Sequence, residues 1–334
     1  MGGGLTVKRR ATVVMKRSVI SYNNATWRCC GIPPGSYGAR WQAAGVFVDL
    51  DAHATFEHVN MSHNWAEWDA GAFYSLGVDV RVLSCNFHDN DSRDGPAAIL
   101  VTAGNATFHA CHIHSNRNRQ SAAVKADAGS HQQTIGVPDV FRPVNMSMSD
   151  CKIHHNYQVH DLWRWQLGNN QISGGGLFVD VPDNPAGPSI VTLNRCEIFD
   201  NTAAQGGGVC VGGGHLSLND CDIHSNEAER GGGLAVIGGI VTLTRTLVDR
   251  NRLVPPQYVF HEVLRVFPEA SGDVGANVFT QSILYYLLPT PPGHAIADRM
   301  HSPLLYSAES LTALLRVGFA DCVAGTGFPT RNVL

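Results

Sequence analysis

The chain has 334 residues, of which 44% are hydrophobic and 16% are charged, with a formal net charge of -4. This composition allows a sizeable core, but it gives no electrostatic basis for binding nucleic acid, and no Lys/Arg stripe follows the sequence. No 18-residue apolar span occurs, so no transmembrane segment is predicted. Residues 1–20 contain basic residues but no long apolar region, and they do not predict a secretory signal.

A repeat organises most of the chain. Residues 201–226 and 226–251 are consecutive copies of a 25-residue unit that runs from one asparagine to the next. Each copy has a glycine triplet, at 206–208 and 231–233, and three short runs of alternating apolar residues. A fixed period with short alternating runs is typical of a solenoid built from β-strands.

The same frame extends towards the N-terminus. It contains the asparagines Asn23, Asn64, Asn90, Asn116, Asn156, Asn201, Asn226 and Asn251. Three residues before them lies an apolar column, consisting of Ile20, Met61, Phe87, Ile113, Ile153, Ile198, Ile223 and Val248. Five residues before them the side chains are small and mostly thiols, including Cys85, Cys111, Cys151, Cys196 and Cys221. We expect these cysteines to stack as small hydrophobic residues and not to form disulfides.

Taken in order, residues 1–280 are expected to form about eight to nine rungs, a rung being one turn of the solenoid. Inserts interrupt the repeat at 24–42, 127–143, 157–172 and 182–188. Residues 275–279 could begin one more rung after Asn251, where the frame weakens. Residues 281–334 are expected to form a small irregular or helical C-terminal cap, with a short helix near 308–317.

These features predict an all-β fold, a right-handed parallel β-helix. Stacked rungs about 4.8 Å apart pair each strand with its copy, so equivalent residues form continuous columns. We expect the glycine triplets to supply the positive φ that tight corners need. The asparagines are expected to stack their amides from rung to rung and to hydrogen-bond the corner backbone.

The repeat also resembles a known family. Its Gly-Gly-Gly-Leu/Val-x-Val and Cys-x-Ile-His-x-Asn halves, over about residues 12–251, are similar to the repeat of chlamydial polymorphic outer-membrane proteins and of algal and protist right-handed β-helix proteins. Residues 283–293 are similar to a segment that follows such helices in the protist proteins. The resemblance implies a non-catalytic adhesion or scaffold module of a larger extracellular or cell-surface protein. No cofactor is expected.

An enzyme is the alternative prediction, because parallel β-helices also include polysaccharide lyases, hydrolases and epimerases. Asp150 and Asp220 share a column, and Arg195 lies between them in the repeat. They are the candidate catalytic residues, since such sites combine clustered carboxylates with an arginine base. A solubilising ladder of charges explains the same pattern more simply.

Histidines provide a candidate metal site, although no metal is predicted. His88, His114 and His154 occupy one outward column in three consecutive rungs. Imidazoles about 5 Å apart could share a metal ion. The simpler interpretation is an exposed ring stack, because Phe199 takes the same place in the next rung.

All six tryptophans follow the asparagine column at one corner. Trp65 and Trp68 on one rung, with Trp163 and Trp165 three rungs later, would form two aromatic walls roughly 14 Å apart, with polar residues between them. We expect this trough to bind a short glycan or an extended peptide, unless the indoles only seal the inserts against the helix wall. The predicted binding residues are Trp65, Trp68, Asp91, Arg93, Arg117, Arg119, Trp163 and Trp165.

Overall fold

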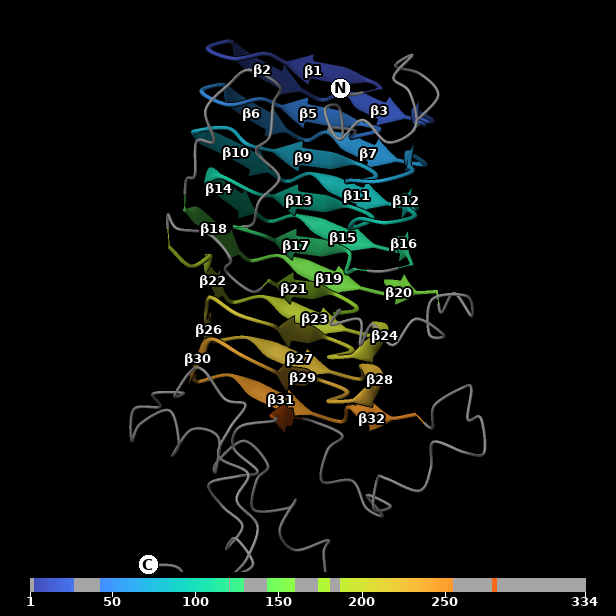
Figure 1. The fold of residues 1–334 in the computed structure, drawn as a ribbon, viewed down its shortest axis with the longest axis vertical. Helices are drawn as coiled ribbons and strands as arrows, with labels where there is room; N and C mark the ends of the chain where they lie inside the picture. Colours follow the sequence, from blue (N-terminus) through green and yellow to red (C-terminus); the bar gives the residue numbers. More distant parts are fainter. Residues whose placement is uncertain are drawn as a thin grey trace, which may run out of the picture.

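The computed structural model describes residues 3–26, 43–119, 121–128, 143–159, 174–180 and 187–254, together with the backbone of 278–280. Within these ranges the regular secondary structure consists of β-strands only. The strands form four parallel sheets, and each sheet takes every fourth strand of the chain. The result is an elongated parallel β-helix of about eight rungs, with the N-terminal rung at one end (Figure 1).

Sheets A and B each take one strand per rung. Sheet A contains β1 (Leu5–Val7), β5 (Val46–Val48), β9 (Phe73–Ser75), β13 (Ile99–Val101), β17 (Val124–Ala126), β21 (Leu177–Val179), β25 (Val209–Val211), β29 (Leu234–Val236) and β33 (Val278–Thr280). Sheet B contains β2 (Thr12–Lys16), β6 (His53–Glu57), β10 (Asp79–Leu83), β14 (Gly104–His109), β18 (Val144–Ser149), β22 (Ile190–Asn194), β26 (His215–Asn219) and β30 (Ile240–Thr244).

Sheets C and D lie on either side of the asparagine column. Sheet C contains β3 (Val19–Ser21), β7 (Asn60–Ser62), β11 (Asn86–His88), β15 (His112–His114), β19 (Lys152–His154), β23 (Glu197–Phe199), β27 (Asp222–His224) and β31 (Leu247–Asp249). Sheet D contains β4 (Asn24–Ala25), β8 (Trp65–Ala66), β12 (Asp91–Ser92), β16 (Arg117–Asn118), β20 (Tyr157–Gln158), β24 (Thr202–Gln205), β28 (Glu227–Arg230) and β32 (Arg252–Leu253).

Sheet D is a fourth strand per rung, where the repeat predicted three. Its strands begin directly after each asparagine, so the polar residues predicted between the aromatic walls lie partly in strands, at Asp91–Ser92 and Arg117–Asn118. Asn24–Ala25 and Tyr157–Gln158, assigned to inserts, also pair in this sheet. One strand of the expected additional rung is present, because β33 pairs with β29. Most insert residues and the expected C-terminal cap with its helix lie outside the described residues.

The inward columns form the core. Ile223 is fully buried and pairs with Ile198 on one side and with Val248 on the other. The five column cysteines are buried and free, as expected. Each thiol also makes backbone contacts; the Sγ of Cys85, for example, accepts a hydrogen bond from the backbone N of Val59 at 3.3 Å. The neighbouring thiol of the preceding rung, together with burial, raises the pKa of Cys151 to about 12.

The asparagine column forms a buried hydrogen-bond ladder, as predicted. The Nδ2 of Asn116 donates to the Oδ1 of Asn156 at 2.9 Å and to the backbone O of Phe87 at 2.9 Å. Its Oδ1 accepts hydrogen bonds from the Nδ2 and backbone N of Asn90 at 3.0 and 3.1 Å. Each amide between the two ends of the column therefore joins three consecutive rungs and satisfies backbone groups that would otherwise be buried without partners.

The corners use positive φ in a different way from the prediction. The first glycine of a triplet does take it, with φ of 58° at Gly206. The corners between sheets B and C and between sheets C and D instead place non-glycine residues there, such as Asp150 at 55° and His63 at 54°. The third glycine is needed for space, because a Cβ on Gly208 would lie 2.7 Å from the backbone O of Gly233. Asp and His tolerate this region better than β-branched residues do.

Candidate functional site

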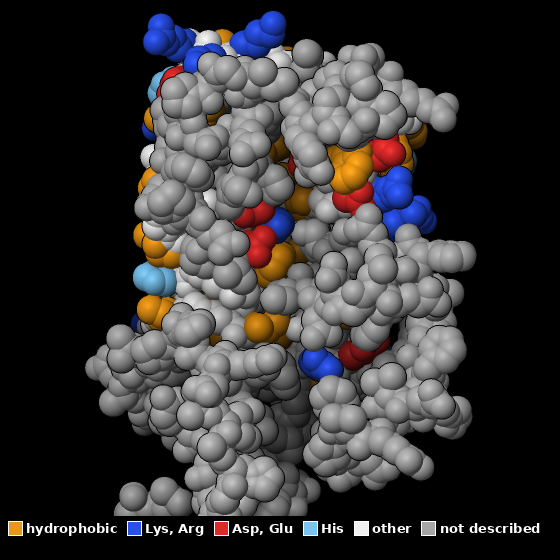
Figure 2. All heavy atoms as spheres, in the orientation of Figure 1, with side chains coloured by type: hydrophobic (Ala, Val, Ile, Leu, Met, Phe, Trp, Pro, Cys, Tyr) orange, Lys and Arg blue, Asp and Glu red, His pale blue; other side chains and the backbone are white. Residues whose placement is uncertain are grey.

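The outward face of sheet D aligns the predicted binding residues. In β8, β12 and β16 the second residue is buried and the first points outwards. The register pairs Trp65 with Asp91, Asp91 with Arg117 and Arg117 with Tyr157. We call these four residues the sheet D column. Figure 2 shows hydrophobic, acidic and basic side chains together where β8, β12 and β16 lie, near the right-hand edge of the view.

Aromatic residues bound this column at both ends. Trp65 is partly buried and Tyr157 is 43% exposed. The two stand three rungs apart, or roughly 14 Å. Trp68, just after β8, is also partly buried. Trp163 and Trp165, the predicted second wall, lie outside the described residues.

Tyr157 was missed by the sequence reasoning, which placed it in an insert. One signal could have identified it. It directly follows Asn156, as Trp65 follows Asn64 and Asp91 follows Asn90, so the frame assigns it to the same column. The described structure therefore supplies a second aromatic wall without the two tryptophans of the insert.

An ion pair lies between the aromatic residues. The Nε of Arg117 is 3.3 Å from the Oδ2 of Asp91. Burial raises the pKa of the Asp91 carboxyl, and the charges of Arg117 and Arg119 act in the opposite direction. Among the described residues, nothing hydrogen-bonds the buried Oδ1 of Asp91. A buried acceptor without a partner costs free energy, so a hydroxyl group that reached this oxygen would remove that cost.

A second pair of charges lies beside the column. The Nη1 of Arg93 is 3.3 Å from the Oε1 of Glu67 on the preceding rung. Acidic and basic groups thus neutralise one another across this face. Aromatic rings combined with a few fixed polar groups favour an uncharged, hydroxyl-rich ligand over a strongly charged one.

The candidate catalytic residues form exposed ion pairs at another corner, between sheets B and C. Asp150 accepts two hydrogen bonds from Arg195, both at 2.8 Å. Asp220 pairs in the same way with Arg245, at 2.6 and 2.7 Å. The hydrogen bonds from these arginines hold the pKa of both carboxyls below the usual value, and Asp150 raises the pKa of Arg195. Arg195 is already protonated, and its two hydrogen bonds to a carboxylate keep it so, which makes it poorly suited to act as a base. The geometry is that of exposed ion pairs stacked from rung to rung.

The histidine column on sheet C forms a ring stack. His88 and His114 are 5.2 Å apart with planes 6° apart, and His114 and His154 are 5.0 Å apart with planes 5° apart. Phe199 continues the stack 4.7 Å from His154. Imidazole donates to a metal through a lone pair in its ring plane, so parallel stacked rings do not converge on one ion. Burial, with the charge of His114 next, lowers the pKa of His154 to about 4.

Comparison with known proteins identifies the family. Residues 1–253 match the family model described as a right handed beta helix region. No curated protein and no solved structure matches the chain. Within the described ranges, no helix has the length and apolar character needed to cross a membrane. Because the match covers most of the chain and the sheets are parallel throughout, the chain belongs to the family of right-handed parallel β-helix proteins.

Proposed function

We propose that the chain is a non-catalytic binding module that holds a short glycan against the sheet D column. The observation that carries this proposal is the alignment of Trp65, Asp91, Arg117 and Tyr157 on consecutive rungs. Indole and phenol rings can pack against the apolar faces of sugars. The side chains of Asp91 and Arg117, which are partly exposed, would hydrogen-bond the sugar hydroxyls.

A glycan fits this face better than an extended peptide. An added peptide strand obtains its affinity from backbone hydrogen bonds at a free sheet edge. Both β12 and β16 are paired with neighbouring strands on each side, so the middle of the column offers no such edge. A ligand in the middle of the column must therefore be recognised by side chains alone. Sugars can be bound in this way, with aromatic side chains against their apolar faces and polar side chains on their hydroxyl groups.

The binding module is proposed to be part of a larger protein. The resemblance to polymorphic outer-membrane-protein repeats supports a role in adhesion or as a scaffold within a larger cell-surface or secreted protein. A rigid solenoid suits such a role, because each rung is held by its neighbours and the column keeps its spacing without a ligand.

One observation favours the alternative, a carbohydrate-active enzyme. The raised pKa of Asp91, set by burial, is a property that a general acid requires. Its pairing with Arg117 fits binding better, since a cation beside the carboxyl favours the ionised form. Prolonged incubation of the wild type and an Asp91→Asn variant with each bound glycan separates the two functions. Turnover by the wild type that the variant lacks would show an enzyme.

The binding proposal is tested with a glycan array, followed by calorimetry on the glycans that bind. Trp65→Ala and Tyr157→Ala should each weaken binding about tenfold, as expected when a central aromatic contact is removed. Tyr22→Ala is the matched control, because Tyr22 is an exposed aromatic residue (76%) outside sheet D. Unchanged binding in the Trp65→Ala and Tyr157→Ala double variant would refute the sheet D column as the binding surface.

A further inference from the structure

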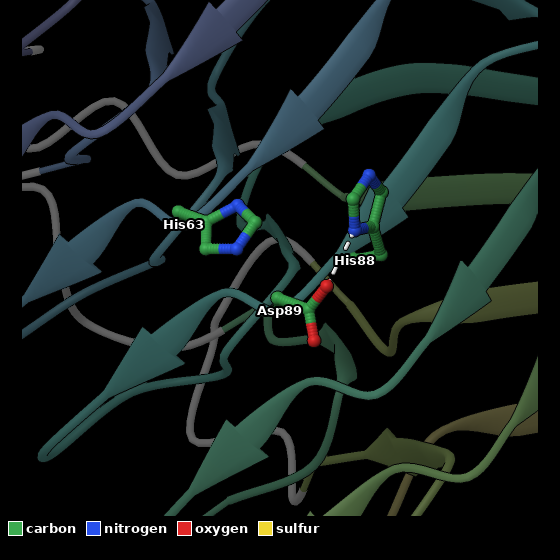
Figure 3. Close-up of side chains that lie close together, drawn as sticks. All are labelled: His63, His88 and Asp89. Carbon is green, nitrogen blue, oxygen red and sulfur yellow. Dashed lines mark hydrogen bonds and ion pairs between the residues drawn. The ribbon is translucent and has the colours of Figure 1, made fainter.

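A second cluster of polar side chains lies at the corner between sheets C and D. It consists of His63, His88 and Asp89, whose candidate ligand atoms all lie within 4.8 Å of one another. His63 and Asp89 hold the same corner position in adjacent rungs, with φ of 54° and 53°. His88 is the last residue of β11. Figure 3 shows the Asp89 carboxylate between the two imidazoles.

The two imidazoles of this cluster are oriented differently from the stacked rings of sheet C. The planes of His63 and His88 are 83° apart, with centroids at 5.9 Å. Perpendicular rings can direct in-plane nitrogen lone pairs towards one point. The Nδ1 of His88 also lies 2.7 Å from the Oδ2 of Asp89. A carboxylate oxygen and two imidazoles therefore meet at this corner.

Stacking contacts hold both rings in place. His63 stacks on Tyr22 at 4.7 Å with planes 18° apart. His88 stacks on His114 at 5.2 Å. A ring whose orientation is set by its neighbours loses less conformational freedom when it binds a ligand, so the cluster is partly preorganised.

We propose that His63, His88 and Asp89 form a binding site for a divalent transition-metal ion of the Zn²⁺, Cu²⁺ and Ni²⁺ class. Two imidazoles and a carboxylate suit these ions, whereas Mg²⁺ and Ca²⁺ prefer oxygen ligands alone. Zinc sites have bonds of about 2.0–2.1 Å, so tetrahedral ligand atoms lie about 3.3 Å apart. A small shift of the exposed His63 and Asp89 side chains, one that keeps the stacking of His63 on Tyr22, would close the remaining separation. Water would complete the coordination.

The chain contains a natural control for this site. His155, Phe199 and Asp200 occupy the equivalent three positions on two later rungs, as the register and the positive φ of His155 and Asp200 show. The rings of His155 and Phe199 are 6.0 Å apart with planes 83° apart, close to the geometry of the proposed site. Phe199 has no donor nitrogen, so this second cluster lacks the ligand that corresponds to His88.

The site is tested by equilibrium dialysis and calorimetry with Zn²⁺, Cu²⁺ and Ni²⁺ chlorides and the purified chain. We expect one tight equivalent in the wild type and a loss of at least about tenfold in affinity in His88→Phe and in His63→Ala. The stack already accommodates a phenyl ring at Phe199, so His88→Phe should fold. Circular dichroism of each variant checks this.

Two further variants sharpen the result. His155→Ala should bind metal as the wild type does, although the Nδ1 of His154 contacts His155 at 2.9 Å. Phe199→His should add a second equivalent, because it restores the missing ligand. Electron paramagnetic resonance of the Cu²⁺ complex should show two coordinating nitrogens that fall to one in His88→Phe. Metal binding that survives His88→Phe and is lost in His155→Ala, or no binding by the wild type, would overturn the proposal.

Discussion

The substitution Asn116→Asp tests the asparagine ladder with almost no change in side-chain shape. Asn116 is fully buried, and its Nδ2 donates to the Oδ1 of Asn156 and to the backbone O of Phe87, both at 2.9 Å. Aspartate would keep the acceptor oxygen that Asn90 uses. It would replace the donor nitrogen with a second oxygen that faces two acceptors.

The expected cost follows from the two lost donor contacts. Each buried acceptor left unsatisfied costs about 1–3 kcal/mol, so Asn116→Asp should lower the free energy of unfolding by roughly 2–6 kcal/mol. Burial should also raise the pKa of the new carboxyl above its unfolded value of about 3.9. A raised folded-state pKa makes the variant lose stability as pH rises, so its deficit against the wild type should be larger at pH 8 than at pH 5.

Urea unfolding at pH 5 and pH 8, followed by circular dichroism, measures this deficit. Asn145→Asp is the control, because Asn145 is exposed on sheet B and its Nδ2 donates to the Oδ1 of Asn105 at 3.1 Å. The control should change the free energy of unfolding by less than about 0.5 kcal/mol. Equal stability of the two variants at pH 8 would refute the view that the ladder holds the rungs together.

Three further predictions concern the core, pH and the charge ladder. Ile223→Ala should cost about 2–5 kcal/mol, and hydrogen exchange should rise mainly in neighbouring rungs, whereas a uniform rise would argue against nearest-neighbour coupling. Because the pKa of His154 is lowered to about 4, stability should be lost as pH falls from about 6.5 to 4, and His154→Phe should weaken that dependence in urea titrations. Arg195→Ala removes an exposed pair with Asp150 and should leave the urea midpoint unchanged; a clear shift would show that the pair stabilises the fold.

The sequence was sufficient to predict the architecture because the same pattern of residues recurs in every rung. The spacing of asparagines and the apolar residues three places earlier, such as Ile198 and Ile223, predicted parallel stacking and the inward columns. It also predicted the buried cysteines. Any one rung is ambiguous, but a column that stays apolar through eight rungs can only face a shared core.

Sheet D shows where the sequence was insufficient. Most of its strands are two residues long, which is too short for an alternating pattern to be recognised. Its outward residues also differ in chemistry from rung to rung, as Trp65, Asp91 and Tyr157 do. The backbone conformation of the corners could not be predicted from the sequence either. Asp150 and His63 take positive φ there, and no glycine marks these positions.

The candidate sites divide in the same way. The sequence alone placed Trp65, Asp91 and Arg117 at one corner and the histidines in one column, because positions in a repeat translate directly into positions in a solenoid. Only the tertiary structure determined which side chains face one another. His88 stacks in parallel on His114 but stands perpendicular to His63, since ring orientation depends on packing between rungs and on contacts such as the one with Asp89.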